Sequence, residues 1–310
     1  MLDIPYYMTT GYHDKMVAAV IHEANRIYRL WCINNPEFSH RGRVQLIAHS
    51  LGSAIVVDIL SDQPTRIRHD WDITKLPLKD LPVDHFAFDV HNLFMVGSPV
   101  GLFLFLKRSN LLPRRGRKKP GSEDLDVDGI PGVTGERGTY GCLAVDNVYN
   151  VAHIYDPVAL CLNATVDVDY AATLTQAFVP SSSTSWFSAP SFWPLGTTMV
   201  NKRVNTTLEP SAVARLPSVV VPETPELTPE ELAKRKAFLL NDNGQIDFFL
   251  QDSSGPLEFQ YLAMLSAHMS YWNSHGFVRM LLTETGRRPG RNGTLVGMRA
   301  QQKGYVPSTK

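Results

Sequence analysis

The chain has 310 residues, 30 basic and 30 acidic side chains, and an apolar fraction of 44%. This is enough apolar material for one large or two small domains, and the balanced charge gives no reason to expect nucleic acid as the main partner. The three cysteines, Cys32, Cys142 and Cys161, have no CxxC spacing, which argues against a disulfide framework and against a zinc site.

The amino terminus lacks the pattern of a signal peptide, and the longest clearly apolar run is Val100–Leu106. A membrane-spanning helix needs about 20 such residues. The chain is therefore expected to be soluble or bound at a membrane surface.

The first predicted elements lead to a conspicuous serine. Within Leu2–Met8 the pattern would fit a strand, and the apolar spacing over residues 14–33 predicts an amphipathic helix. Val44–Ala48 is typical of a buried strand, and it runs directly into His49-Ser50-Leu51-Gly52-Ser53. Ala54–Leu60 is then predicted to be a helix. Its β-branched residues have a poor helix propensity, which a buried helix tolerates.

Later elements alternate between strands and helices. Strands are predicted at Leu93–Val96, Val148–Ile154 and Gln245–Gln251, a short helix is predicted to begin after a Thr228 cap, and a long helix is predicted over residues 257–283. Such alternation predicts an α/β fold, an α/β-hydrolase-like, mostly parallel sheet with helices on both faces.

The segment Ala48-His49-Ser50-Leu51-Gly52 has the arrangement of a nucleophile elbow, because it lies between a strand and a helix. The sharp turn requires small neighbours, which Ala48 and Gly52 supply, and it would raise the Ser50 hydroxyl at the edge of the sheet. The Leu51 N–H is the expected oxyanion donor. The alternative is an ordinary strand-to-helix turn with a serine cap.

A serine nucleophile needs a base that is oriented by an acid, and in this fold the chain order is serine, acid, histidine. Asp156 directly follows a predicted strand and is the expected acid; its alternative role is to form an Asp-Pro turn. His268 and His275 are the candidate bases, with His268 favoured because it lies in an aromatic, largely apolar helix. Its alternative role is that of a core histidine. We expect His49 to support the elbow and His153 to be structural.

Several segments occur in the same order as in one known family. The chain resembles the DDHD-domain family, the intracellular phospholipases A1 that prefer phosphatidic acid, over about residues 1 to 110, 142 to 162 and 244 to 283. The segments that carry the resemblance are NRIYRLW, NPEF, LIAHSLGSAIVVDIL, FMVGSPVGLF, VYNVAHIYDPVA, QIDFFLQ and LSAHMSYW.

The resemblance places the family nucleophile on Ser50, two of its aspartates on Asp156 and Asp247, and its histidine on His268. Its last aspartate has no counterpart, because the stretch reads Asn273-Ser274-His275-Gly276. The family's association with metal binding therefore lacks a full ligand set here, and we expect no metal and no organic cofactor. Asp247 remains an alternative triad acid.

The composition of successive segments, together with the resemblance, predicts the domain organisation. We expect the following units: 1–110, a hydrolase core with the nucleophile elbow; 111–141, an exposed, partly disordered basic Gly/Pro-rich insertion; 142–170, the core strand that carries the acid; 171–243, a variable Ser/Pro-rich segment; 244–286, the strand and helix that carry the histidine; and 287–310, a flexible tail.

In this fold further strands and a loop with a second oxyanion donor come before the elbow, and we expect them upstream of Met1. Loss of one such donor lowers the rate about 100- to 1,000-fold.

The expected partner is a phospholipid membrane surface that contains anionic lipids. Two features would contact it: the basic cluster Arg114–Lys119, and the aromatic residues Trp186, Phe187, Phe192 and Trp193. The alternatives are a solvated loop or targeting signal for the first feature and core packing for the second. The resemblance implies a cytoplasmic protein attached peripherally to endoplasmic reticulum and Golgi membranes.

The predicted function is that of a phospholipase A1-like serine hydrolase that cleaves acyl esters of glycerophospholipids. Two alternatives stay open. One is a catalytically inactive membrane-binding or scaffolding remnant of the same fold, and the other is a carboxylesterase that acts on soluble esters.

Overall fold

A computed structural model describes residues 6–67, 72–119, 130–180, 227–250 and 266–304 of the chain. Its centre is one sheet of four parallel strands in the order β1-β2-β5-β6. The strands are β1 (Val44–His49), β2 (Val90–Val96), β5 (Val145–His153) and β6 (Asp247–Leu250). The predicted α/β class with a mostly parallel sheet is confirmed.

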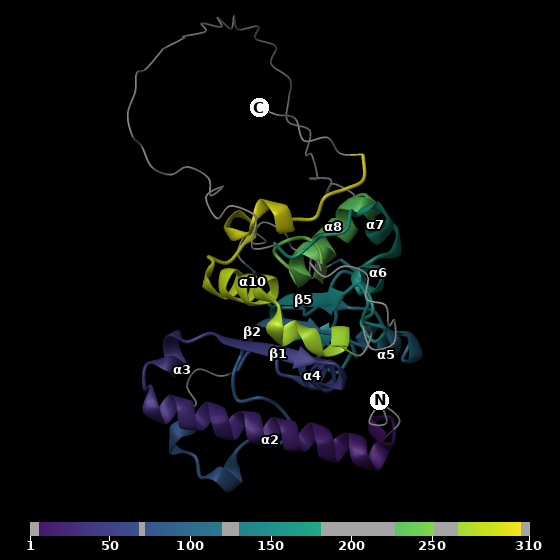
Figure 1. Ribbon diagram of the computed structural model, residues 1–310. Coiled ribbons are helices and arrows are strands. Elements are labelled where there is room, and N and C mark those ends of the chain that lie inside the picture. The colour runs from purple at the N-terminus through teal and green to yellow at the C-terminus, as the bar shows by residue number, and fades with distance from the viewer. Residues whose placement is uncertain (1–5, 68–71, 120–129, 181–226, 251–265, 305–310) are drawn as a thin grey trace, which may run out of the picture.

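Helices cover both faces of this sheet (Figure 1). They are α2 (Thr10–Asn34), α3 (Phe38–Arg41), α4 (Leu51–Asp62), α5 (Val100–Leu106), α6 (Asn163–Val166), α7 (Val168–Thr173), α8 (Pro229–Leu240) and α10 (His275–Gly286). A second small sheet joins β3 (Leu112–Pro113) to β4 (Cys142–Leu143), and five 3-10 turns lie at Ile73–Lys75, Leu78–Asp80, Ser270–Asn273, Arg291–Gly293 and Val296–Met298.

The alternation of side chains along the strands produces two cores. Leu93 and Met95 of β2 face α2, α4 and α8, whereas Phe94 and Val96 face Tyr271 and α10. Successive side chains of a strand point to opposite faces, so an almost wholly apolar strand packs against helices on both sides.

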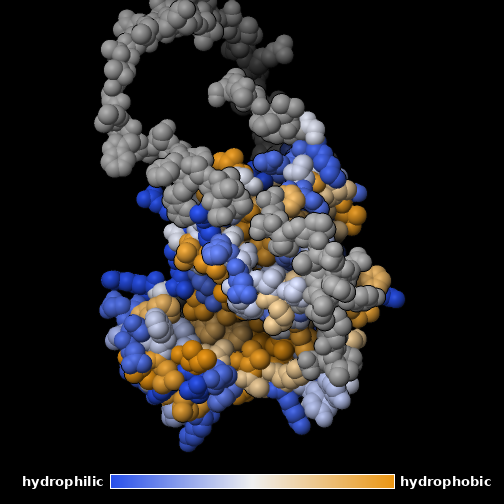
Figure 2. All heavy atoms as spheres, viewed as in Figure 1, coloured by the Kyte–Doolittle hydropathy of each residue, from blue (hydrophilic) through white to orange (hydrophobic). Residues whose placement is uncertain are grey.

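Strand β1 is one of the two edge strands of the sheet within the described residues, and its Ile47 is 43% exposed. Figure 2 shows apolar residues gathered in the band between α2 and the body of the molecule above it. None of the described helices is long and apolar enough to cross a membrane.

The predicted strand at Leu2–Met8 is wrong in its described part, because Tyr6–Met8 forms a helical turn. Tyr7 is buried there, and its hydroxyl donates to the carboxylate of Asp58. The Tyr7 side chain therefore anchors this segment on α4 and does not take part in a sheet.

The predicted long helix over residues 257–283 is also wrong, since the described part is broken at Ser274. A 3-10 turn ends at Asn273, and α10 begins after Ser274, whose hydroxyl accepts a hydrogen bond from the Phe277 N–H. Serine favours such a cap over a helix interior. Residues 257–265 lie outside the described residues.

The start of α8 is as predicted. Thr228 caps it, Pro229 occupies its first position, and Glu231 completes a capping box by accepting a hydrogen bond from the Thr228 N–H at 2.9 Å. The reciprocal bonds satisfy two backbone donors at the helix start, which explains why this local pattern identified the element correctly.

The expectation that the basic cluster is exposed is wrong for three of its members. Arg114, Arg117 and Lys119 are buried at 3%, 9% and 5% exposure. The Arg114 guanidinium donates to carbonyl oxygens at the end of α4, among them those of Leu60 and Ser61 at 2.9 and 2.7 Å. These carbonyls lack partners inside the helix, so the cation caps the helix and balances its dipole.

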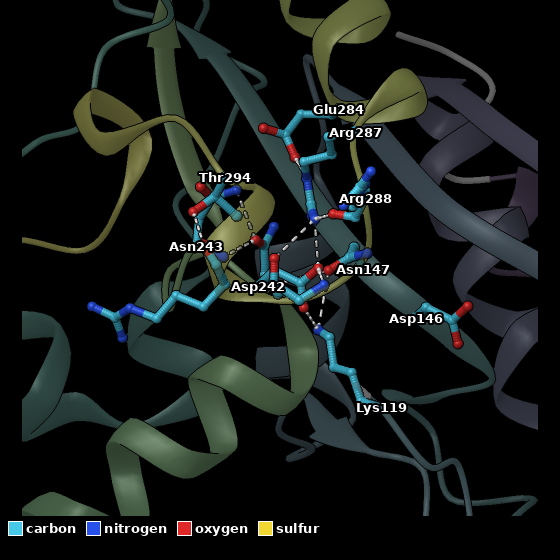
Figure 3. Close-up of polar contacts among 12 residues, drawn as sticks. Lys119, Asp146, Asn147, Asp242, Asn243, Glu284, Arg287, Arg288 and Thr294 are labelled. Carbon is cyan, nitrogen blue, oxygen red and sulfur yellow. Dashed lines mark hydrogen bonds and ion pairs between the residues drawn. The ribbon is translucent and has the colours of Figure 1, made fainter. Parts of the chain in front are cut away.

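The expectation of a flexible tail is wrong for residues 287–304. Arg287 forms ion pairs with Asp242 at 2.7 Å and Glu284 at 2.5 Å, and Met298 is fully buried. Asp242 also pairs with Lys119 at 3.1 Å, and burial lowers the pKa of this lysine to about 8. Figure 3 shows Asp242 between the two cations, so one buried carboxylate joins the basic insertion to the tail.

The aromatic residues of the predicted Ser/Pro-rich segment, Trp186, Phe187, Phe192 and Trp193, lie outside the described residues.

Candidate active site

Three side chains from distant parts of the chain meet at the carboxyl edge of the sheet. His268 Nε2 lies 3.0 Å from Ser50 Oγ, and His268 Nδ1 lies 2.9 Å from Asp156 Oδ2. Ser50 follows β1, Asp156 follows β5 by a short turn, and His268 lies in a helical turn just before Ser270–Asn273. The ends of parallel strands share one edge, which explains how residues over 100 positions apart come together.

The serine lies on a strained turn. Its φ of 54° and ψ of −128° place it outside the regions that L residues prefer. Strain of this kind costs of order 1–3 kcal/mol and is sustained only by the surrounding structure. Here the Ser50 N–H donates to the Val96 carbonyl at 3.0 Å, and α4 begins at the next residue. The turn therefore holds the hydroxyl above the end of the sheet.

Leu51 is the first residue of α4, so its N–H has no acceptor within the helix. The amino terminus of this 12-residue helix also carries the positive end of its dipole. A negative oxygen formed next to Ser50 would meet both, which fits the expected oxyanion role of Leu51.

The Asp156 carboxylate is buried and held from several sides. Beyond His268, it accepts from the Tyr271 hydroxyl at 2.7 Å and from the Val158 N–H at 2.9 Å. The bond to Val158 closes a local turn, so the turn-forming alternative and the contact with the histidine are both realised. Tyr271 itself accepts from the His153 N–H at 2.9 Å. Burial and the neighbouring carboxylate raise the pKa of this phenol well above its usual range, so it remains a donor.

The structure brings Asp156 to the histidine and places Asp247 elsewhere. The Asp247 carboxylate accepts from the Leu162 N–H and the Asn163 N–H, each at 2.8 Å, and from the Asn150 side chain. Burial raises its pKa. Its role in the structure is to fix the start of α6 beside β6.

Two further features of the site were not predicted. Gly97, just after β2, has a φ of 58°, and a Cβ there would lie 2.8 Å from Asp156 Oδ2 and 3.0 Å from His268 Nδ1. The glycine at the end of a buried strand was the available signal. For Tyr271 the available signal was its spacing, because a residue three positions after His268 lies on the same face of a helical turn.

The other histidines have separate places. His49 Nε2 donates to the His268 carbonyl oxygen at 2.8 Å, and the two rings lie 4.7 Å apart. This contact suits the expected support of the elbow. His275 is exposed at the start of α10, and His153 is buried in β5.

The described residues do not form a metal site. They contain no group of three or more histidine, cysteine or acidic side chains suited to hold an ion. The lone pairs of Asp156 and Asp247 are used by separate sets of donors, and the two carboxylates do not converge. The family's association with metal binding thus finds no suitable donor set in this part of the chain.

A family model matches the central and carboxyl-terminal parts of the chain, from a point after Ser50. Residues 86–219 and 221–285 match the model of the DDHD domain. Over 92% of its length the chain is 28% identical to a probable mitochondrial phospholipase of Saccharomyces cerevisiae and 27% identical to one of Schizosaccharomyces pombe. It is 31% identical to human phospholipase DDHD1 over 145 residues, which cover 34% of the chain and 16% of that protein.

The chain spans about a third of the two yeast relatives, 34% and 37% of their lengths. No solved structure matches it significantly.

Proposed function

The chain belongs to the DDHD domain family, and we propose that it is a phospholipase A1-type serine hydrolase that cleaves acyl esters of glycerophospholipids. The observation that carries the proposal is the relay from Ser50 Oγ through His268 to Asp156, with contacts of 3.0 and 2.9 Å. In this arrangement the base lies within hydrogen-bond reach of the nucleophile and is itself oriented by a buried acid.

In the proposed reaction Ser50 Oγ attacks the ester carbonyl carbon while its proton passes to His268 Nε2. Asp156 stabilises the imidazolium that forms, and the Leu51 N–H donates to the oxyanion. When the tetrahedral intermediate collapses, the C–O bond to the glycerol breaks and His268 returns the proton to the departing alkoxide. Water then attacks the acyl-enzyme with the same base, which releases a fatty acid and restores the serine.

The lipid substrate is supported by the names of the relatives. Besides the yeast phospholipases, an intracellular phospholipase A1 of Caenorhabditis elegans is 26% identical over 197 residues, which cover 51% of this chain and 20% of that protein. A mouse protein named triacylglycerol hydrolase DDHD2 is 42% identical over 67 residues. Preference for phosphatidic acid, peripheral attachment to intracellular membranes and cleavage at the sn-1 ester belong to the same proposal.

The experiment is covalent labelling with a fluorophosphonate probe, combined with hydrolysis of phosphatidic acid vesicles. Wild type is expected to carry the label on Ser50 and to release lysophosphatidic acid, while Ser50→Ala does neither. Hydrolysis by Ser50→Ala at the wild-type rate would overturn the role of Ser50, and absence of hydrolysis and of label in wild type would favour an inactive binding module. Rapid hydrolysis of a soluble short-chain ester without hydrolysis of vesicles would identify a carboxylesterase instead.

A further inference from the structure

Helix α5 is apolar on both of its sides. Val100, Phe103 and Leu104 are buried in the core, yet Leu102, Phe105 and Leu106 are 41%, 78% and 50% exposed. The three exposed residues have the i, i+3, i+4 spacing of a single helix face. A helix that is apolar all round is normally buried in a protein core or in lipid, and α5 has only its inner half in the core.

This exposed face lies beside the catalytic edge of the sheet. Helix α5 begins three residues after Gly97, the residue packed against His268 and Asp156. In Figure 1 it lies at the end of the sheet toward which β1 points, and Ser50 follows β1 at that end.

A second exposed apolar segment adjoins the helix. Leu160 packs against Gly101, where an added Cβ would lie 3.0 Å from the leucine Cβ, and its N–H donates to the Ser98 carbonyl at 3.0 Å. Leu160 is 38% exposed, and Ile154 and Tyr155 of the same segment are 53% and 52% exposed. We refer to Leu102, Phe105, Leu106, Ile154, Tyr155 and Leu160 as the apolar rim.

Two exposed cations end the helix. Lys107 pairs with Asp58 at 3.0 Å and lies over the Tyr140 ring, while Arg108 extends into solvent. Apolar side chains next to a basic residue suit the boundary between acyl chains and anionic headgroups, where an exposed cation such as Arg108 contributes about 1 kcal/mol. The buried Arg114, Arg117 and Lys119 cannot serve in this way.

We propose that the apolar rim docks on the surface of an anionic phospholipid bilayer and thereby brings Ser50 to the acyl esters of the lipid. The proposal rests on the proposed function, since it assigns a membrane surface to the same site. Docking by the rim inserts the exposed faces of α5 and of the 154–160 segment into the interfacial layer. The substrate then reaches the serine without crossing water.

The test uses a triple variant, Leu102→Ser with Phe105→Ser and Leu106→Ser. Helix α2 offers a matched control, because Ile27, Leu30 and Trp31 have the same spacing and are 55%, 41% and 52% exposed. They lie near the end of α2 that leads through α3 to the start of β1, away from the edge that carries Ser50. The control is therefore Ile27→Ser with Leu30→Ser and Trp31→Ser.

Binding is measured by co-sedimentation with vesicles of ether-linked phosphatidylcholine and phosphatidic acid, which a phospholipase A1 cannot cleave. The α5 variant is expected to lose about tenfold or more in partition coefficient, since affinity follows buried apolar area, while the α2 variant keeps wild-type binding. The single variant Phe105→Ser, at the most exposed position, should show part of the loss and guards against misfolding of the triple variant. Wild-type binding by the α5 variant, or an equal loss in the α2 variant, would overturn the proposal.

Hydrolysis of a soluble short-chain ester and fluorophosphonate labelling are measured on the same proteins. The α5 variant should keep both at wild-type levels, because Leu102, Phe105 and Leu106 take no part in the hydrogen bonds among Ser50, His268 and Asp156. Absence of label on Ser50 in all of them, with vesicle binding still dependent on α5, would reject the catalytic proposal and leave the docking surface standing.

Discussion

The Tyr271 hydroxyl donates a hydrogen bond to Asp156 Oδ2 at 2.7 Å, and the same oxygen lies 2.9 Å from His268 Nδ1. The carboxylate is thus clamped between a tyrosine and a histidine from one helical turn. Because Tyr271 also accepts from the His153 N–H, the clamp is fixed to the end of β5. The orientation of the proposed base depends on this tyrosine.

Substitution Tyr271→Phe removes the clamp and keeps the ring. A hydrogen bond to a charged group contributes roughly 1.5–3 kcal/mol, so we expect kcat to fall about tenfold to a hundredfold with little change in KM. The His153 N–H loses its acceptor, and the free energy of unfolding should fall by about 1–3 kcal/mol. Steady-state kinetics and urea unfolding measure the two effects. A raised KM at unchanged kcat would show that the tyrosine contacts substrate instead.

The two aspartates should respond differently to conversion to asparagine. Asp156→Asn replaces the acceptor of His268 and is expected to lower kcat by about 10⁴, with the protein still folded. Asp247→Asn turns an amide toward the backbone donors of Leu162 and Asn163 and should instead lower the free energy of unfolding by about 1–3 kcal/mol. The folded fraction of this second variant should keep near wild-type kcat. The reverse pattern would make Asp247 the acid.

Two glycines near the site provide a steric test. Gly97→Ala places a methyl group at a positive φ and within 3.0 Å of both Asp156 and His268, so we expect loss of most activity. Gly52→Ala is the matched control, because a Cβ there would meet no described atom within 4 Å and alanine favours a helix by about 1 kcal/mol. Comparable loss of activity in both variants would contradict this explanation. It would indicate that the turn at Ser50, and not the space beside His268 and Asp156, fails to accommodate an added methyl group.

Stability in acid should depend on Asp146. Burial alone would raise the pKa of this carboxyl, but hydrogen bonds from His91 and Arg117 and the arginine charge outweigh it and hold the pKa well below its usual range. The unfolded state then takes up the proton first, with a pKa of about 3.9, so the stabilisation is complete above that pH and is lost as pH falls toward the folded value.

The matched variant is Asp146→Asn. The wild-type advantage in unfolding free energy, expected to be about 1.5–3 kcal/mol near neutral pH, should shrink as pH falls below about 4. Urea unfolding over a pH series measures it. An advantage that stays constant from neutral pH into this acid range would contradict the assignment.

The sequence by itself determined the elements whose signals are local. The strand-to-helix turn at Ser50, the buried strand Leu93–Val96 and the helix cap at Thr228 are set by residues within a few positions of one another, and the structure has each where it was predicted. Apolar periodicity reports which residues leave water, and capping reports where a helix begins.

Only the tertiary structure decided which partners those elements meet. It brought Asp156 rather than Asp247 to His268, and it buried Arg114 against the end of α4. It also left Phe105 of an apolar helix in solvent. Charge and hydropathy are properties of a residue type, whereas burial and pairing depend on which surfaces the fold brings together, so the same arginine could be solvated or could cap a helix until the packing was known.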